Sequence, residues 1–357
     1  GPLQENPRAG ENTPLMDLAS IYAPVRDDLD SLGRLLRDEL SADDPFVGEL
    51  VAHVLKTRGK FLRPALVCLS ALACRARDPR AGETGGGLAH ADGGGARLEV
   101  AGATELIHVA SLIHDDVIDA ADLRRGQASV NAIWGNQVAV LLGDYLFSKA
   151  FHMLARLQDA SLAAAMASAT VKMSQSEIKQ IKYGNTPHTD EAIYFDIIAG
   201  KTAHLFSAAC RCGALSAGAA EAETAALTSF GLEWGMAFQI TDDALDLTAT
   251  AEQVGKPIGS DIQTGKVTLP IIHALTVAPE SDRRRLAEIL GSGDGDRAPQ
   301  AMGEVSAILA RCGAIDHAFE VARSRAERAA ASLTRLRASA ARGSLEALVE
   351  FVTVRSR

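Results

Sequence analysis

Apolar residues recur at intervals of three or four over most of this chain. Near the N-terminus the pattern is carried by Ile21, Val25, Leu29, Leu32 and Leu36. Such spacing puts the apolar side chains on one face of an α-helix. The same periodicity extends over residues 13–75 and returns from Leu98 almost to the end, whereas strand-like alternation is nowhere persuasive. The pattern therefore predicts an all-α protein.

Three interruptions divide the helical pattern. Runs of glycine predict a flexible surface loop over residues 76–97, a polar Gly-rich stretch predicts a second loop at 291–299, and Pro187 predicts a break. We expect residues 13–357 to form a single-domain helical bundle around a central cavity. Residues 1–12 are set apart as a tag scar and a disordered N-terminus.

The composition narrows the classes of protein. Of 357 residues, 47% are hydrophobic but only 4% are aromatic, which favours helices packed closely through small side chains. The net charge of -9 argues against nucleic acid as a partner. No apolar run approaches the roughly 18 residues that cross a membrane, and no secretory signal precedes the helices. We expect a cytoplasmic protein, with peripheral contact at a membrane left open.

Two aspartate clusters of the same form carry the strongest chemical signal. They read Asp115-Asp116-Val117-Ile118-Asp119 and Asp242-Asp243-Ala244-Leu245-Asp246. Aspartates four positions apart share a helix face and repel one another. Mg²⁺ relieves the repulsion, because it takes one or two protein carboxylates and completes its shell with water and phosphate oxygens. The clusters predict a magnesium and polyphosphate site at the mouth of the cavity, with two solvated acidic patches as the alternative.

Basic residues near glycines suit the other side of a diphosphate, because glycine allows close approach and Lys and Arg make charge-assisted contacts. The candidates are Lys60, Arg63, Arg124, Arg125, Lys201, Lys256 and Lys266. His108 lies about two helical turns before Asp115 and is either a further diphosphate donor or a core histidine. His114 is better explained as a hydrogen-bonding neighbour than as a metal ligand. Gly200-Lys201-Thr202 is no nucleotide P-loop, because the upstream glycine is replaced by Phe195.

The segments that hold the aspartate clusters strongly resemble the two aspartate-rich regions of trans-polyprenyl diphosphate synthases, the isoprenyl diphosphate synthases with long, octaprenyl- or decaprenyl-like products. These segments are residues 106–126 and 235–246. Further blocks occur in the family's order: GKFLRP (59–64), GDYLF (143–147), GKT (200–202) and GKPIGSDIQTGKVTLP (255–270). The resemblance covers about residues 30–275 and implies the isoprenoid synthase fold. One departure is that Arg58 and Phe61 replace a Gly and an Arg of the usual Gly-Gly-Lys-Arg block.

The resemblance implies a role for each matching residue. Three Mg²⁺ ions would be held by Asp115, Asp119 and Asp242, supported by Asp116, Asp243 and Asp246. The allylic diphosphate would be bound by Arg124, Lys201 and Lys266. Isopentenyl diphosphate would be bound by Lys60, Arg63, His108 and Arg125. Thr202 and Gln239 would face the reacting carbon, and Lys256 would close over the site.

The implied reaction is a head-to-tail 1′-4 condensation of isopentenyl diphosphate onto an allylic prenyl diphosphate. Metals and basic residues would stabilise the leaving diphosphate, and released pyrophosphate would take the proton. Product length would follow from the floor of the cavity. The floor is expected at Ala110, Ser111, Ile107, Phe147 and Phe151. Because Ala110 and Ser111 are small where short-chain members carry an aromatic, we expect a long all-trans product such as a quinone side-chain precursor.

Two alternatives remain at this point. A class I terpene cyclase shares the first motif, but its second metal motif usually runs Asn or Asp, then Ser or Thr, then Glu, whereas here it is DDALD. A prenyl-diphosphate-binding subunit of a heteromeric synthase generally lacks one aspartate cluster, and both are present here. The resemblance also implies a homodimer.

Overall fold

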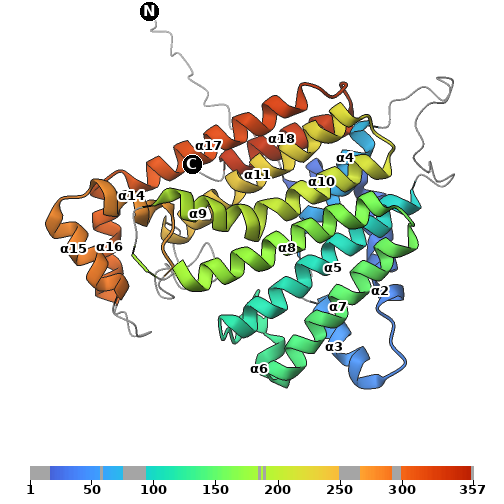
Figure 1. Ribbon diagram of the computed structural model, residues 1–357, viewed down its shortest axis with the longest axis horizontal. Coiled ribbons are helices and arrows are strands. Elements are labelled where there is room, and N and C mark those ends of the chain that lie inside the picture. Colours follow the sequence, from blue (N-terminus) through green and yellow to red (C-terminus); the bar gives the residue numbers. More distant parts are fainter. Residues whose placement is uncertain are drawn as a thin grey trace, which may run out of the picture.

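Helices account for nearly all of the described chain, which confirms the all-α prediction (Figure 1). The computed structural model describes residues 17–56, 59–74, 94–183, 186–187, 190–248, 266–291 and 299–354. The first elements are α1 (Leu18–Ile21), the 3₁₀ turn η1 (Ala23–Val25), α2 (Arg26–Glu39), α3 (Pro45–Lys56), α4 (Leu62–Cys74), α5 (Gly95–Ile118), β1 (Leu123–Arg124), β2 (Gln127–Ala128), α6 (Val130–Trp134), α7 (Asn136–Arg156) and α8 (Ala160–Tyr183). The later elements are α9 (Glu191–Ile198), the π-helical turn η2 (Ala199–Ala203), α10 (His204–Ser216), α11 (Glu221–Thr248), α14 (Leu269–Val277), α15 (Glu280–Gly291), α16 (Pro299–Arg311), α17 (Ala314–Leu333) and α18 (Ala340–Val354).

The long helices form one bundle. Helix α5 packs against α4, α7 and α10, and α10 packs against α4, α8 and α11. Helices α17 and α18 lie along α11, while α14, α15 and α16 gather at one end of the molecule (Figure 1). The aspartate clusters fall near the C-terminal ends of α5 and α11.

Small residues let the central helices approach closely, as the composition predicted. A Cβ atom on Gly231 of α11 would lie 2.6 Å from the carbonyl oxygen of Phe206 in α10. Only glycine permits that backbone approach. The closely packed α10 and α11 therefore form a rigid support for the residues at their ends.

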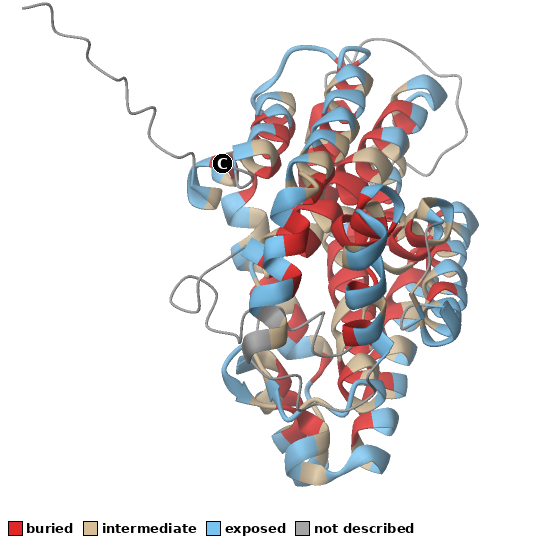
Figure 2. Ribbon diagram, turned by 90° about the vertical axis from the view of Figure 1, so that its left-hand side faces the viewer, coloured by how far each residue is buried: buried red, intermediate tan, exposed pale blue. Residues whose placement is uncertain are grey.

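Two groups of buried apolar residues hold the bundle together. The larger group runs through α2, α4, α5, α7, α8, α10 and α18, and the smaller joins α9 and the second half of α11 to α14–α17. Buried residues line the inward helix faces and exposed ones the outward faces (Figure 2). Trp234 of α11 is fully buried, and its indole nitrogen donates to the Leu348 carbonyl of α18 at 2.9 Å.

The structure corrects two expectations about local structure. A two-stranded antiparallel hairpin pairs Leu123 with Ala128 and Arg124 with Gln127, although no strand was expected. Its tight turn holds Arg125 at φ 52° and Gly126 at φ 75°, a combination typical of hairpin turns. Helix α5 begins at Gly95, so residues 95–97 are helical rather than part of the predicted loop. Most of that loop, residues 76–93, lies outside the described residues.

Helix α7 corrects a third expectation. It is long and apolar enough to cross a membrane by length and composition, with a mean hydropathy of 1.3, whereas the sequence was thought to contain no such stretch. Ala139, Leu142, Leu146, Ala150 and Met153 are buried, and the helix packs along α5. Packing within the bundle accounts for these residues, whereas only 39% of the apolar window is buried and Val140 and Leu141 are exposed.

Candidate active site

The first aspartate cluster ends helix α5, and one of its members faces a lysine from a distant element. Asp119 caps the helix, and its backbone amide donates to the Asp115 carbonyl at 2.8 Å. Lys201 Nζ lies 3.5 Å from Asp115 Oδ2 and 2.8 Å from Glu177 Oε2 of α8. The predicted lysine and aspartate are thus brought together, and Glu177 joins them.

The surroundings of Asp115 disfavour the ionised form of its carboxyl group. Burial raises the pKa of Asp115 to about 6, and the nearby Glu177 and Asp119 carboxylates add to that shift, while Lys201 opposes it. The pKa of Lys201 is also displaced: burial lowers it, but the attraction of Asp115 and Glu177 outweighs burial and the net shift is upward. Three close carboxylates with one lysine leave a surplus of negative charge that suits a divalent cation.

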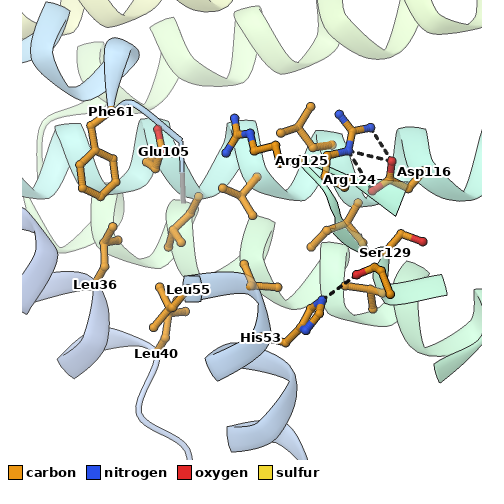
Figure 3. A pocket seen from close by; sticks show the side chains of 17 residues that line it. Leu36, Leu40, His53, Leu55, Phe61, Glu105, Asp116, Arg124, Arg125 and Ser129 are labelled. Carbon is orange, nitrogen blue, oxygen red and sulfur yellow. Dashed lines mark hydrogen bonds and ion pairs between the residues drawn. The ribbon is translucent and has the colours of Figure 1, made fainter. Parts of the chain in front are cut away.

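Asp116 points away from this group and is held by Arg124. The side chain of Asp116 is buried, and Arg124 Nε donates to its two oxygens at 2.8 and 3.1 Å, with a further close contact from Nη2 (Figure 3). The hairpin places Arg124 there, because Ser129 and Asn131 just beyond it bond back to the Ala121 carbonyl. Asp116 and Arg124 therefore fix the hairpin against the end of α5.

The π-helical turn η2 connects the two aspartate clusters. Lys201 reaches Asp115 of the first cluster, and the neighbouring Thr202 donates to Gln239 Oε1 at 2.8 Å, one helical turn before Asp243. A Cβ atom on Gly200 would lie 1.6 Å from Ser176 Oγ of α8, so this wide turn packs directly on α8. Wide π-turns of this kind are frequent at functional sites.

The second cluster is organised around Asp243. Its buried carboxylate accepts from Tyr194 Oη at 2.7 Å and from Gln239 Nε2 at 2.7 Å. Asp242 and Asp246 are half-buried on the same helix. The sequence predicted Gln239 as a site residue, but Tyr194 comes from α9 and is 49 positions away from Asp243.

A basic group lies beside the first cluster. Burial lowers the pKa of Arg63 to about 10, and among nearby charges Glu105 and Asp242 oppose the shift while Arg125 adds to it. Burial, and then the charges of Arg63, Arg125 and Arg124, hold the pKa of His108 well below its usual range. Three predicted cations and His108 thus gather in one place, with the buried Glu105 as a counter-charge.

Arg63 and Arg125 are also fixed by packing. The Arg63 guanidinium lies 4.3 Å from the centre of the Phe206 ring, and its buried Nε has no hydrogen-bond partner within the described part of the chain. A Cβ atom on Gly59 would be 2.8 Å from Arg125 Nη2, so glycine allows the arginine to lie there. Phe61, the departure from the usual basic block, has φ 49°.

The remaining predicted cations are Lys60, Lys266 and Lys256. Lys60 is exposed and Lys266 is half-buried just before α14. Lys256 lies outside the described residues.

A pocket of about 270 Å³ opens next to Asp115 between α5, α7 and α8. Asp115, Lys201 and Glu177 line one part, and the rest includes Ser111, His114, Phe147 and several apolar residues of α8. Of the predicted floor, Ser111 and Phe147 line the pocket. Ala110 and Ile107 are fully buried, and Phe151 packs against the core, and none of these three residues lines the pocket. His114 Nε2 lies 3.1 Å from the Val140 carbonyl oxygen.

A smaller pocket of about 50 Å³ lies between α2, α3, α5 and the hairpin. Figure 3 shows its lining, in which Arg124, Arg125 and Glu105 stand above the apolar side chains of Leu36, Leu40 and others. The two pockets share no lining residue, and the larger includes Asp115 whereas the smaller includes Asp116. The adjacent aspartates thus separate them.

Sequence reasoning missed Glu177, Tyr194 and Glu105 as members of the site. Glu177 and Tyr194 are far in sequence from the aspartates they serve, whereas Glu105 lies on α5 three positions before His108 and could have been found from that helical spacing. Glu177 and Tyr194 become visible only when α8 and α9 pack beside α5 and α11.

The fold and the site define an all-α enzyme in which two acidic clusters and a basic group meet beside an apolar pocket. The chain belongs to the polyprenyl synthetase family, whose model matches residues 44–308. It is a prenyltransferase that elongates prenyl diphosphate chains. The predicted reaction class is confirmed, and neither a terpene cyclase nor a binding subunit is favoured.

Similar proteins span most of the chain. Octaprenyl diphosphate synthase of Haemophilus influenzae is 34% identical over 88% of this chain and 90% of its own. A short chain isoprenyl diphosphate synthase of Methanothermobacter thermautotrophicus is 38% identical over 85% of this chain and 88% of its own. Heptaprenyl diphosphate synthase component 2 of Geobacillus stearothermophilus is 37% identical over 94% of this chain and 98% of its own.

Solved structures confirm the isoprenoid synthase fold. A decaprenyl diphosphate synthase from Rhodobacter capsulatus superimposes with a TM-score of 0.85, at 30% identity over 96% of this chain and 100% of that one. A polyprenyl synthase from Caulobacter crescentus, complexed with calcium and isoprenyl diphosphate, also gives 0.85, at 31% identity over 96% and 98%.

Proposed function

We propose that this prenyltransferase condenses isopentenyl diphosphate onto an allylic diphosphate at the site between α5 and α11 and releases a long all-trans product. One observation carries the assignment of the site. The consecutive residues Lys201 and Thr202 contact the first aspartate cluster and the Gln239–Asp243 pair of the second. Both clusters are therefore within reach of one small turn, as a single diphosphate-binding site requires.

The donor set fits divalent cations, and Mg²⁺ is the ion that the family generally uses. Asp116 and Asp243 have their oxygens engaged by Arg124, Tyr194 and Gln239. We assign metal binding to Asp115, Asp119 and Asp242, the ligands of three ions that the family resemblance implies. Bound Mg²⁺ would supply charge neutralisation at the phosphate oxygens of the leaving group.

The basic group fits a second diphosphate. The buried Arg63 Nε lacks a protein partner in the described structure, and an anion would relieve the cost of that buried donor. We assign Arg63, His108, Arg125 and the exposed Lys60 to isopentenyl diphosphate. Lys201 is assigned to the allylic diphosphate, together with Lys266, Lys256 and, if it exchanges Asp116 for phosphate, Arg124.

The chain's own groups then account for the reaction. As the allylic C–O bond breaks, the diphosphate keeps the electron pair and Lys201 stabilises its charge. The Thr202 hydroxyl and Gln239 carbonyl lie beside the resulting cation. The double bond of isopentenyl diphosphate forms the new C–C bond, and the proton lost from the adjacent carbon passes to the released pyrophosphate. The apolar pocket walls exclude water, which would quench the cation.

Product length is proposed to depend on the wall of the larger pocket. Ser111 and Phe147 line that wall, and the small Ala110, which precedes Ser111 on α5, is fully buried. Replacing Ser111 by Phe or Ala110 by Tyr should shorten the product by filling the space. Incubation with isopentenyl diphosphate, farnesyl diphosphate and Mg²⁺, followed by mass analysis of the dephosphorylated alcohols, measures the change.

The same assay tests the function as a whole. A ladder of all-trans alcohols that ends at a long chain supports the proposal, and Ser281→Phe at an exposed position on α15 serves as the matched control. Farnesyl diphosphate converted to hydrocarbon without elongation would favour a cyclase. Binding without turnover would favour a subunit that needs a partner, the kind of assembly that the name of the Geobacillus relative suggests for that protein.

We further propose a homodimer formed through α7 and α8. Both helices expose large apolar side chains, namely Val140, Leu141, Val171, Ile178 and Ile181. Such residues are common at interfaces between copies of a chain.

The proposed compartment is the cytoplasm, with any contact at a membrane limited to the release of the apolar product.

A further inference from the structure

Three side chains with metal-binding chemistry meet outside the two aspartate clusters. Glu191 opens α9, His273 lies in the middle of α14, and His317 lies in the first turn of α17. One candidate ligand atom from each residue lies within 4.8 Å of the other two. The three helices gather at the same end of the molecule (Figure 1), where α14 packs against both α9 and α17.

The contacts within this group leave an imidazole nitrogen unsatisfied. The rings of His273 and His317 are stacked, with centroids 4.0 Å apart and an angle of 19° between their planes. His317 Nε2 is 3.5 Å from Glu191 Oε1, too far for a good hydrogen bond. That nitrogen is shielded from solvent and has no hydrogen-bond partner in the described part of the chain. A buried polar atom without a partner is uncommon and calls for an explanation.

The electrostatics favour neutral imidazole at His273. Burial lowers the pKa of His273 and the neighbouring His317 lowers it further, while Glu191 and a hydrogen bond from the His273 ring to the Cys312 carbonyl oppose the shift. Neutral imidazole is the form that binds metals. A backbone carbonyl that accepts from a histidine ring is also the usual way in which a ligating imidazole is oriented.

We propose that Glu191, His273 and His317 bind one divalent transition-metal ion of the Zn²⁺ class. Two imidazoles and one carboxylate suit Zn²⁺, with water completing the shell. Mg²⁺ prefers oxygen ligands. The aspartate clusters should therefore bind Mg²⁺, and the site with two imidazoles should bind Zn²⁺ instead. Ligand atoms around a tetrahedral Zn²⁺ are about 3.3 Å apart, given Zn–N and Zn–O distances near 2.0 Å. Side-chain movements on the order of one ångström, together with a rotation of the stacked rings that turns one nitrogen of each toward a common point, would close the group onto an ion.

The position of the group connects it to the second aspartate cluster. Glu191 precedes Tyr194 by about one helical turn, and Tyr194 donates to Asp243. His273 belongs to α14, which begins three positions after Lys266. A bound ion would fasten α9, α14 and α17 to one another and so stabilise the end of the bundle that holds Asp243. The inference does not depend on the proposed product or on the assignment of the diphosphate ligands.

The test is a calorimetric titration of the full chain with ZnCl₂ after chelator treatment and dialysis. Excess Mg²⁺ is kept present so that the aspartate clusters are saturated. The expected result is one equivalent of Zn²⁺ per chain, with affinity reduced at least about 10-fold in His273→Ala and in His317→Ala, since loss of a ligand removes one metal–protein bond. His152→Ala, on the exposed face of α7, is the matched control and should bind as the wild type does.

Two further measurements keep the result decisive. Zn²⁺ should raise the thermal midpoint of the wild type and leave that of the conservative variant Glu191→Gln less affected, because only a ligand for the folded state stabilises it. Co²⁺ in place of Zn²⁺ should give visible absorption bands that are lost in His317→Ala. The proposal is overturned if no Zn²⁺ binds in excess Mg²⁺. It is equally overturned if the histidine variants bind normally while Asp115→Asn or Asp242→Asn abolishes binding.

Discussion

The second aspartate of each cluster is buried and hydrogen-bonded to side chains around it. Asp116 and Asp243 each have a carboxylate that accepts from at least one side chain of another element. Arg124 holds the first, and Tyr194 with Gln239 holds the second. We infer that in both clusters the second aspartate fixes the end of its helix.

Removal of the Tyr194 hydroxyl tests this inference at the second cluster. Tyr194→Phe leaves one buried oxygen of Asp243 without its donor, which should lower the free energy of unfolding by about 1–2 kcal/mol. Urea unfolding measures that loss. Tyr183→Phe, at an exposed position on α8, is the control and should be near neutral. Equal effects from the two variants would show that the bond to Asp243 contributes nothing particular.

In the metal-free protein, Asp115 should make the free energy of unfolding depend on pH. Burial raises the pKa of Asp115 to about 6 from its usual 3.8, so the native state holds this proton more tightly than the unfolded state. The contribution of Asp115 to the free energy of unfolding should therefore fall as the pH rises from about 4 to about 6 and stay level above. Asp115→Asn should remove that part of the slope in urea unfolding. Curves for wild type and variant that run parallel over this range would contradict the prediction.

Among the elements, the long helices were predictable and the short irregular ones were not. Apolar periodicity extends over many turns of α5 and α11, whereas the hairpin consists of two residues per strand and depends on the positive φ of Arg125 and Gly126. The start of α5 at Gly95 was missed because a glycine run resembles a loop although its last residue enters the helix. The turn η2 contains ordinary residues, so nothing in its sequence marks the wider helix.

The close packing of η2 on α8 gives a prediction at this scale. Gly200→Ala would put a Cβ atom 1.6 Å from Ser176 Oγ, so the backbone or α8 must move. Overpacking of this kind costs about 1–3 kcal/mol, and displacement of Lys201 should reduce turnover as well. Thermal unfolding and the elongation assay measure the two effects.

A double variant tests whether the loss comes from this contact or would follow from any substitution in the turn η2. Ser176→Gly combined with Gly200→Ala removes the opposing hydroxyl and should recover part of both losses. No recovery would mean that the close contact with the Lys172 carbonyl, at 2.8 Å from the same Cβ position, dominates instead.

For the whole molecule, sequence motifs identified most of the site but not its internal connections. Lys201 was expected to bind a diphosphate, yet its ion pair with Glu177 depends on two helices that pack together only in the folded bundle. Likewise, Ala110 was expected on the cavity floor, but its side chain is fully buried and does not line the larger pocket. Spacing along one helix shows which residues share a face of that helix. It does not show how far the packing of a neighbouring helix buries them.

The proposed dimer gives a prediction about the assembled enzyme. Leu141 is 67% exposed on α7, and Leu141→Glu should convert a dimer into a monomer by burying an unpaired charge in the interface. Light scattering coupled to size exclusion measures the mass. Val277→Glu, at an exposed position at the end of α14, is the control and should leave the mass of the particle in solution unchanged. A wild type that is already monomeric would contradict the dimer.

The hydrogen bond between Trp234 and Leu348 has a consequence for the order of events during synthesis. The carbonyl that completes the burial of Trp234 is translated 114 positions later. At typical rates of elongation the delay is on the order of ten seconds. For most of that interval the ribosome carries a nascent chain whose second aspartate cluster has been made but whose supporting helix α18 has not. Metal binding by both clusters together should therefore be acquired late, after α18 has emerged and docked.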